Sequence, residues 1–212
     1  MTQEEAVFLA KRDIVDLIYA SAKIEGIGVT YPDTNEIYEG RSVAGLSVDD
    51  VLKINNLKHA WKYVLDDVNK AVNLEYIKTL HNVLGSHEIV NSGFLRRDDV
   101  YIGGTDWRPE KPDEENASEN VKEIVEIGDP LDSALSMFCY LCRAQLFYDG
   151  NKRIAQLVAN KILIAGGVGV LRVPDDKQKS FLELLVRYYE TDDPSELKTF
   201  LADNAIRSQR FS

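Results

Sequence analysis

The stretch Gln145-Leu-Phe-Tyr-Asp-Gly-Asn-Lys-Arg-Ile-Ala-Gln156 concentrates residues that are suited to holding a phosphate group. Asn151 follows a turn-forming glycine and is a favourable N-cap, so a helix is predicted to begin there. The first turn of a helix exposes unpaired backbone N–H groups and the positive end of the macrodipole. Gly150 lets a ligand approach the backbone, and Lys152 and Arg153 add positive charge. These residues predict an anion site, with a capped helix carrying surface charges as the alternative.

Asp149 comes one residue before the glycine of this stretch. Its carboxylate would repel a bare phosphate, but it could hold a divalent cation that bridges phosphate oxygens, because magnesium commonly takes one or two protein carboxylates together with phosphate and water. The cysteines indicate no metal site. Cys139 and Cys142 lie three apart in an apolar helical run, without a second Cys or His cluster nearby, and are expected to be buried thiols.

Two helices are predicted to flank the phosphate-binding stretch and to position it. Asp129 supplies an N-cap and Pro130 a favourable first helical residue. One apolar face then follows, through Leu131, Leu135, Phe138, Cys142 and Gln145. The second helix is predicted from apolar residues at helical spacing, Ile154, Leu157, Val158, Ile162 and Leu163. The segment 130–166 is thus predicted to be a helix-loop-helix that carries the site.

The segment 4–25 is predicted to be a helix whose apolar stripe ends in a carboxylate. The stripe advances by three or four residues through Val7, Ala10, Ile14, Leu17, Ile18 and Ser21. The same stripe reaches Glu25, and Gly26 is a candidate left-handed C-cap. Glu25 is therefore expected either at the edge of the core, with a role in the site, or in solvent at a frayed helix end.

The rest of the chain supplies further helices. Residues 26–46 have little periodicity and are predicted to form an ordered loop with short extended pieces. Helices are predicted over 47–64 and 74–84, and two more begin near Pro174 and Pro194. With a short helix at the end of the acidic connection between residues 109 and 127, the sequence predicts seven or eight helices. His59, His81 and His87 are expected to be surface or hydrogen-bonded structural residues.

Gly103 and Gly104 predict the one hairpin of the chain. They separate Asp99–Ile102 from Thr105–Trp107, and two glycines between short extended runs favour a tight turn. A lone hairpin is marginally stable, so it must lie over the helical body. There it could act as a lid, as a docking edge for an extended peptide, or as a purely structural element.

The composition is that of one acidic globular domain. The chain has 212 residues, 44% of them hydrophobic, and a net charge of −10, which argues against a broad surface for nucleic acid. It shows no internal repeat and no shift in composition, so residues 1–212 are expected to form a single domain. The first residues lack a basic region followed by an apolar one, and no apolar run is long enough to span a bilayer, so a cytoplasmic protein with no membrane partner is expected.

The phosphate-binding stretch resembles the signature of the Fic family, H-x-F-x-(D/E)-G-N-(G/K)-R, at Phe147, Asp149, Gly150, Asn151, Lys152 and Arg153. Ser21-Ala-Lys-Ile-Glu25-Gly26 resembles the inhibitory motif of that family, (S/T)-x-x-x-E-(G/N). The segment Val100–Pro109 resembles its flap hairpin, and Leu80-His81 with Gly93 and Arg96 resembles the stretch that precedes the flap. The resemblance implies an all-α Fic fold with one small β-hairpin flap over 99–108 and an inhibitory-type helix over 1–26.

The resemblance also implies transfer of AMP from ATP to a side-chain hydroxyl of a target protein. By position, Asp149 would hold Mg²⁺, and Gly150, Asn151, Lys152 and Arg153 would bind the phosphates. The flap residues Ile102, Gly103, Gly104 and Thr105 would hold the target segment by strand-like pairing. Ser21, Glu25 and Gly26 would form the inhibitory motif, with Glu25 blocking the productive pose of the γ-phosphate.

Two positions depart from the family pattern. The histidine that removes the proton from the attacking hydroxyl is replaced by Gln145, and an amide cannot accept that proton near neutral pH. Gln156 stands where many members carry an arginine that pairs with the inhibitory glutamate. Glu25 is therefore expected to pair with Arg153 or Lys152, or to hydrogen-bond to Gln156.

Two functions follow from this pattern. One is a Fic-type AMP transferase that is weak or inactive because of Gln145 and that is autoinhibited through Glu25. The other is a non-catalytic Fic-like module that binds a nucleotide or a protein. The reverse reaction, removal of AMP with Glu25 orienting water, is a further alternative that would also lack the histidine. The apolar N-terminal helix can pack on its own chain or on a second copy in a homodimer.

Overall fold

The computed structural model describes residues 1–208, which form ten α-helices and one two-stranded antiparallel sheet. The predicted mainly helical fold is confirmed. The elements are α1 (Gln3–Arg12), α2 (Ile14–Ile24), α3 (Tyr31–Tyr38), α4 (Val48–Asp66), α5 (Leu74–Leu84), α6 (Glu114–Val125), α7 (Pro130–Ala144), α8 (Asn151–Ala165), β1 (Val170–Leu171), the 3₁₀ turn η1 (Asp175–Lys177), α9 (Gln178–Thr191), α10 (Ser195–Asn204) and β2 (Ile206–Arg207).

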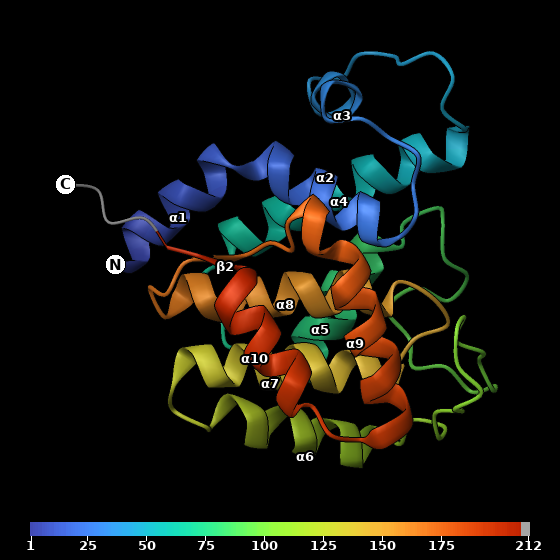
Figure 1. Ribbon diagram of the computed structural model, residues 1–212, viewed down its shortest axis with the longest axis vertical. Coiled ribbons are helices and arrows are strands. Elements are labelled where there is room, and N and C mark those ends of the chain that lie inside the picture. Colours follow the sequence, from blue (N-terminus) through green and yellow to red (C-terminus); the bar gives the residue numbers. More distant parts are fainter. Residues whose placement is uncertain (209–212) are drawn as a thin grey trace.

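Helices α7 and α8 lie side by side at the centre of the molecule (Figure 1). Twelve of the fifteen residues of α8 are buried, so other elements cover this helix on nearly every side. Helices α1, α2 and α4 lie beyond α8, whereas α6 lies beyond α7 (Figure 1). Asp129 caps α7 by accepting a hydrogen bond from the Asp132 N–H at 2.8 Å. The helix-loop-helix predicted over 130–166 is therefore confirmed, and it forms the core.

The two cysteines of α7 are free and buried, as predicted. Burial raises the pKa of the Cys139 thiol to about 12 and that of the Cys142 thiol well above its ordinary value. Both thiols are therefore protonated and unreactive near neutral pH. Across residues 1–208, no group of three or more His, Cys, Asp or Glu side chains is arranged to hold a metal ion.

The N-terminal segment forms two helices, so the prediction of one helix over 4–25 is wrong. The helix is interrupted at Asp13, whose φ of −98° and ψ of 14° separate α1 from α2. The Asp13 carboxylate is ion-paired with Arg12 at 2.8 Å and with Arg207, in β2, at 3.1 Å. These pairs hold the break in place. Gly26 follows α2 with a φ of 75°, which is the left-handed ending that was predicted.

Helix α3 lies in the segment that was predicted to be a loop, residues 26–46. A capping box starts it: the Asp33 N–H donates to Thr30 Oγ1 at 3.3 Å, and the Thr30 N–H donates to the Asp33 carboxylate at 3.2 Å. Pro32 lies in its first turn. Only Thr34 and Ile37 of α3 are buried, so the helix has no apolar stripe that periodicity could detect. It projects from one end of the molecule (Figure 1).

The sheet of the described chain lies elsewhere than predicted. It pairs β1 with β2, with Val170 opposite Arg207 and Leu171 opposite Ile206. The predicted hairpin over 99–108 has its turn at Gly103-Gly104, but neither flank is a strand, so a paired hairpin there is wrong.

Side-chain contacts hold the flap segment instead. The Trp107 N–H donates to Thr105 Oγ1 at 3.1 Å rather than to the other side of the turn. The same Thr105 hydroxyl donates to Glu190 Oε1 on α9 at 3.3 Å, and the Trp107 ring stacks on Tyr189. An isolated two-stranded ladder is only marginally stable, and these contacts with α9 fix the segment without one.

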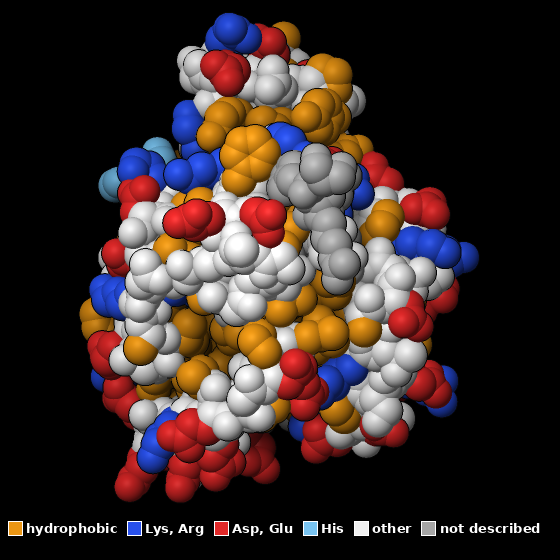
Figure 2. Space-filling view, turned by 90° about the vertical axis from the view of Figure 1, so that its left-hand side faces the viewer, with side chains coloured by type: hydrophobic (Ala, Val, Ile, Leu, Met, Phe, Trp, Pro, Cys, Tyr) orange, Lys and Arg blue, Asp and Glu red, His pale blue; other side chains and the backbone are white. Residues whose placement is uncertain are grey.

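Acidic side chains gather at the lower end of the molecule in Figure 2, the height at which Figure 1 places α6. Helix α6 carries exposed glutamates at positions 114, 115, 119 and 123 and contributes strongly to the net charge of −10. Among residues 1–208, no helix combines the length and apolar character that crossing a membrane requires.

Asn160, on α8, is 1% exposed and ties β1 to the core. Its Oδ1 accepts from the Leu171 N–H at 2.7 Å, and its Nδ2 donates to the Leu171 carbonyl at 3.0 Å. We expect Asn160→Ala to lower the free energy of unfolding by about 2–4 kcal/mol, because both groups of Leu171 would stay buried without this partner. Urea denaturation measures the change.

Asn204→Ala is the matched control. Within the described residues its amide donates only to the Phe200 carbonyl, one turn earlier in α10, so we expect a loss below about 1 kcal/mol. Equal losses in the two variants would contradict the bridging role of Asn160.

Candidate functional site

The loop between α7 and α8 is closed by the side chain of Asn151. Its Oδ1 accepts from the Phe147 N–H at 3.0 Å, while its Nδ2 donates to the Phe147 carbonyl at 2.8 Å and to Gln145 Oε1 at 3.0 Å. The N-cap of α8 is Gly150, with a φ of 74°, and it contributes no side-chain cap. The prediction that Asn151 is the N-cap is therefore wrong by one residue. The Asn151 carboxamide instead holds the loop, and the first backbone N–H groups of α8 have no acceptor in the described part of the chain.

His81, on α5, packs against the same loop and hydrogen-bonds to it. Its ring stacks on Phe147 with centroids 3.7 Å apart and planes 6° from parallel, and both residues are fully buried. The Gly93 N–H donates to His81 Nδ1 at 2.9 Å, so the ring proton lies on Nε2 and is donated to the Asp149 carbonyl at 3.0 Å. The prediction that His81 is a hydrogen-bonded structural histidine is confirmed, and its structural task is to shape the phosphate loop.

The pKa of His81 is lowered to about 4. Burial is the largest cause, and the nearby Arg153 charge acts in the same direction, while the hydrogen bond to the Asp149 carbonyl and the Asp149 charge oppose it. His81 is therefore neutral at physiological pH, in the state that donates to the loop.

The predicted anion site would consist of backbone amides at the start of α8. The N–H groups of Asn151, Lys152 and Arg153 lie in the first helical turn and have no acceptor among residues 1–208. Gly150 is required by space as well as by its backbone, because a Cβ there would lie 3.0 Å from Ile89 Cδ1 and 3.5 Å from His81 Nε2. The local structure thus presents donors and a helix N-terminus to the same side.

Arg153 is buried, with its side chain only 1% exposed, and a residue outside the predicted set anchors it. Arg153 Nη1 lies 2.8 Å from Glu88 Oε1 and donates to Glu88 Oε2 at 3.0 Å. The Glu88 side chain is 8% exposed, and Asn56 also donates to it at 3.3 Å. Glu88 lies in the irregular segment after α5, where neither periodicity nor a recognised motif marks it. This ion pair fixes the guanidinium beside the loop.

Glu25 lies at the edge of the core, one of the two positions that the apolar stripe left open, and it contacts cations that the resemblance named as its partners. Its carboxylate oxygens are 3.6 Å from Lys152 Nζ and 3.7 Å from Arg153 Nε, and its side chain is 15% exposed. Gln156 donates to the Lys152 carbonyl at 3.2 Å rather than to Glu25. Of the three expected partners, Lys152 and Arg153 are therefore the ones that contact Glu25.

The other residues of the predicted inhibitory motif contribute through the backbone. The Ser21 hydroxyl is buried and has no hydrogen-bond partner in the described part of the chain, while the Ser21 carbonyl accepts from the Glu25 N–H at 3.3 Å. Gly26 turns the chain away after Glu25. The motif thus orients Glu25 by helix geometry rather than by a serine contact.

A cavity of about 400 Å³ opens beside these groups. The lining residues that carry charge or face the loop are Glu25, Gln145, Asp149, Asn151 and Lys152. Helix α9 supplies an apolar wall, Leu182, Leu185, Val186 and Tyr189. Of the predicted flap residues, Ile102 and Gly103 line the cavity, whereas Gly104 and Thr105 face α9. The cavity therefore joins a charged end at α8 to an apolar end at α9.

Asp149 is placed as a single-carboxylate metal ligand would be. One of its oxygens accepts from the Gly150 N–H at 2.6 Å, and the other lies 3.6 Å from Arg153 Nη2, while the side chain is 66% exposed to the cavity mouth. This exposed, oriented carboxylate fits the prediction of Mg²⁺, which needs few protein ligands when phosphate and water complete its shell.

Gln145 occupies the first position of the stretch but offers no base. It adopts a left-handed backbone conformation, with φ 45° and ψ 57°, where α7 ends. Its Nε2 donates to the Cys142 carbonyl at 2.6 Å, and its Oε1 accepts from Asn151. The carboxamide is thus used within the loop, and it does not titrate near neutral pH.

The pH dependence of stability tests the role of His81. Because the pKa is about 4 in the folded state and about 6.5 in the unfolded state, the unfolded chain binds more protons between these values. Stability conferred by neutral His81 is then lost as pH falls from about 6.5 to 4, by up to about 1.4 kcal/mol per pH unit. We expect His81→Asn to be less stable at pH 7 and to show a shallower loss in this window in urea titrations.

His59→Asn serves as the control, since His59 is exposed on α4. We expect its stability curve to parallel that of the parent chain. If His81→Asn also follows the parent between pH 6.5 and 4, the assignment of a neutral, buried His81 is wrong.

Comparison with known proteins gives matches over the same region. The model of the Fic/DOC family matches residues 71–163. A protein adenylyltransferase Fic from Aedes aegypti is 30% identical over 168 residues, which is 74% of this chain and 33% of the relative. The protein of the same name from Drosophila melanogaster is 28% identical over 189 residues, which is 82% of this chain and 37% of the relative. The chain thus spans about a third of the length of these curated relatives.

Solved structures match the fold over almost the whole chain. Fic-1 (residues 134–508) from C. elegans superposes with a TM-score of 0.79 at 18% identity, over 96% of this chain and 63% of that one. A Fic domain containing signaling protein from Bacteroides thetaiotaomicron gives a TM-score of 0.73 at 17% identity, over 96% and 85% of the two chains. Residues 71–163 therefore match the Fic/DOC family model, and the chain has the mainly helical Fic fold.

Proposed function

We propose that this protein binds ATP in the cavity beside α8 and belongs functionally with the enzymes that transfer AMP to a hydroxyl side chain of a target protein. Its activity is weak because Gln145 replaces the base, and Glu25 holds the site in an autoinhibited state. The name of the relatives, protein adenylyltransferase, supports ATP as the nucleotide.

The observation that carries the proposal is the position of the Glu25 carboxylate. It lies within 3.7 Å of both Lys152 and Arg153, at a helix N-terminus with unpaired amides. A carboxylate in this place neutralises part of the positive charge that a phosphate group would neutralise. This placement supports an anion site at which the chain itself supplies a competing anion.

The shape of the cavity suits the two ends of a nucleotide. The triphosphate lies at the start of α8, where amides and cations converge, and the base lies against the apolar wall of α9. Asp149 would hold Mg²⁺, which neutralises phosphate charge when it is bound. The segment around Ile102 and Gly103 borders the same cavity and would hold the target chain near the α-phosphate.

In the transfer, the target hydroxyl oxygen forms a bond to the α-phosphorus, the bond from that phosphorus to the pyrophosphate oxygen breaks, and the hydroxyl proton must leave. Positioning by the loop and stabilisation of charge by Arg153 remain available. Proton removal by a protein base does not, because the Gln145 amide cannot accept a proton, so the hydroxyl proton passes to solvent water. General-base catalysis is worth about 10²–10⁴-fold, so the proposed transfer is slow rather than abolished.

A non-catalytic nucleotide-binding module is the second candidate. The observation that favours it is the hydrogen-bonded state of Gln145, whose amide links the end of α7 to Asn151. In this role the loop is kept rigid and nucleotide binding alone changes the state of the protein. The two candidates share the cavity and differ only in turnover.

Removal of the Glu25 charge tests autoinhibition. We expect Glu25→Gln to bind Mg-ATP about tenfold more tightly, because the phosphates no longer compete with a carboxylate for Lys152 and Arg153. Isothermal titration calorimetry measures the affinity. Glu4→Gln, an exposed change on α1, is the control and should leave the affinity unchanged. Equal affinity of Glu25→Gln and the parent chain would reject Glu25 as the competitor.

Restoring the base separates the two candidate functions. In the Glu25→Gln background, we expect Gln145→His to raise the rate of AMP transfer by about 10²–10⁴-fold, read as incorporation of label from α-labelled ATP into protein. Labelling already present without the histidine supports slow transfer by the native chain. Tight ATP binding with no labelling in either variant would leave the binding module as the function.

A further inference from the structure

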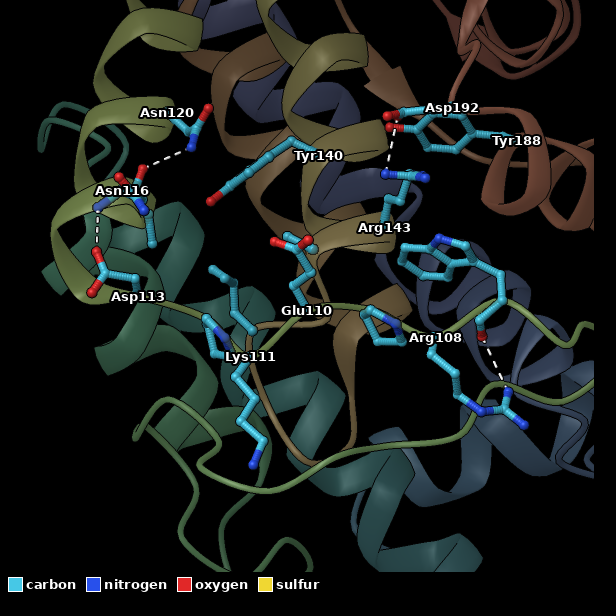
Figure 3. A pocket seen from close by; sticks show the side chains of 16 residues that line it. Arg108, Glu110, Lys111, Asp113, Asn116, Asn120, Tyr140, Arg143, Tyr188 and Asp192 are labelled. Carbon is cyan, nitrogen blue, oxygen red and sulfur yellow. Dashed lines mark hydrogen bonds and ion pairs between the residues drawn. The ribbon is translucent and has the colours of Figure 1, made fainter.

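A second cavity, of about 620 Å³, lies on the other side of the flap segment (Figure 3). It is bounded by residues 107–113, by α6, by the C-terminal half of α7 and by the end of α9. Trp107 separates it from the nucleotide cavity: its ring stacks on Tyr189, which lines the nucleotide cavity, with centroids 5.8 Å apart and planes 7° from parallel. We call this second cavity the Glu110 groove.

The groove is formally neutral, since it is lined by three cations, Arg108, Lys111 and Arg143, and three carboxylates, Glu110, Asp113 and Asp192. Because two of the cations point away from the groove (Figure 3), the charged groups that face it are not neutral in sum. Arg108 Nη1 donates to the Trp107 carbonyl at 3.1 Å, and its guanidinium lies over the Tyr101 ring at 4.5 Å. Lys111 pairs with Asp99 at 3.8 Å. Figure 3 shows Arg108 and Lys111 pointing away from the groove.

Arg143, the third cation, is already neutralised. Its Nη1 lies 3.1 Å from the Asp192 carboxylate, and its guanidinium carbon lies 4.4 Å from the centre of the Trp107 ring. Arg143, Trp107 and Asp192 therefore form one end wall of the groove without offering a free positive charge.

The remaining groups of the groove include hydrogen-bond acceptors without a partner in the described part of the chain. The Glu110 carboxylate and the Tyr140 hydroxyl have no hydrogen-bond or ion-pair partner among residues 1–208, and Figure 3 shows both directed into the same space. Asp113 uses one carboxylate oxygen to cap α6 at Asn116, and Asn120 donates its amide to the Asn116 carbonyl, which leaves its own oxygen free. The carboxylates of Glu110 and Asp113 give the groups that face this space a net negative charge, which favours a cationic donor.

We propose that the Glu110 groove binds an arginine or lysine side chain of the target polypeptide. Its carboxylate and hydroxyl would receive the N–H groups of the basic side chain, and the acidic face of α6 would attract it. This inference rests on the proposed function, because the groove continues from the flap segment that would hold the target chain. A basic residue of the target at a fixed distance from the modified hydroxyl would then select the substrate.

Peptide binding without nucleotide tests the proposal. Fluorescein-labelled peptides of Gly and Ser, with one central Thr, carry a single arginine at each position within about eight residues of it, a reach of roughly 26 Å at 3.3 Å per residue. Matched peptides carry neutral citrulline instead. By fluorescence anisotropy at low salt, we expect the arginine peptide to bind about tenfold more tightly than its citrulline match at a narrow range of spacings, and the difference to shrink as salt is added.

Glu110→Gln should remove this preference for arginine. Glu123→Gln, which removes an equal charge from α6 outside the groove, should retain it. The proposal is overturned if no spacing favours arginine, or if Glu110→Gln keeps the preference. Competition by free arginine amide or spermidine at the same concentrations as the peptide would assign the groove to free cations and would also overturn it.

The outcome is independent of AMP transfer. Arginine-selective binding that depends on Glu110, in a chain that shows no labelling, would support the groove and reject only the catalytic part of the proposed function. Labelling of target proteins regardless of neighbouring basic residues would have the opposite meaning.

Discussion

The buried guanidinium of Arg153 is the group on which the site depends. A fully desolvated cation is costly unless it is paired, and the chain meets that requirement with Glu88 in direct contact and with Glu25 and Asp149 at longer range. These carboxylates come from the segment after α5, from the end of α2 and from the phosphate loop. One charge thus draws together three parts of the sequence. Since Glu88 is the closest partner of Arg153, a ligand anion can replace the carboxylate of Glu25 or Asp149 beside the guanidinium.

The loop between α7 and α8 keeps its shape without a base at position 145. Its shape is set by the amide of Asn151, by the stack of His81 on Phe147 and by glycine at position 150. None of these contacts needs a titratable group at position 145. The glutamine there even adds a hydrogen bond to Asn151. The requirements of binding and of proton transfer are therefore met by separate residues, and one can change while the other persists.

The sequence predicts the centre of the structure better than its periphery. Asp129, Pro130 and the apolar spacing of α7 and α8 lead to the observed helices, because local capping and burial agree there. The apolar stripe left Glu25 either at the edge of the core or in solvent, and the folded arrangement places it at the edge of the core, 15% exposed. The capping box at Thr30 marks α3, but a helix with only two buried residues leaves no periodic signal.

Long-range pairing accounts for the remaining differences. The break at Asp13 involves Arg207, and the flap segment packs on α9 instead of pairing with itself. Glu88 reaches Arg153 across 65 positions of sequence. Propensity and spacing describe neighbours along the chain, so they cannot reveal partners that only the folded arrangement supplies. The charge of the Glu110 groove likewise depends on the folded arrangement. Its lining residues are formally neutral in sum, and the groups that face the groove are negative only because Arg108 and Lys111 point outward.

In the proposed inhibition, the end of the whole helix α2 would act on the cations, rather than one side chain alone. Its last carbonyl, that of Ile24, accepts from Lys152 Nζ at 3.5 Å, beside the Glu25 carboxylate. The negative pole of one helix therefore faces the positive pole of another, α8, end to end. Full release of the cations requires the tip of α2 to withdraw. Because the helical backbone is interrupted at Asp13, the segment that would have to move is the 11-residue helix α2 rather than the whole N-terminal segment.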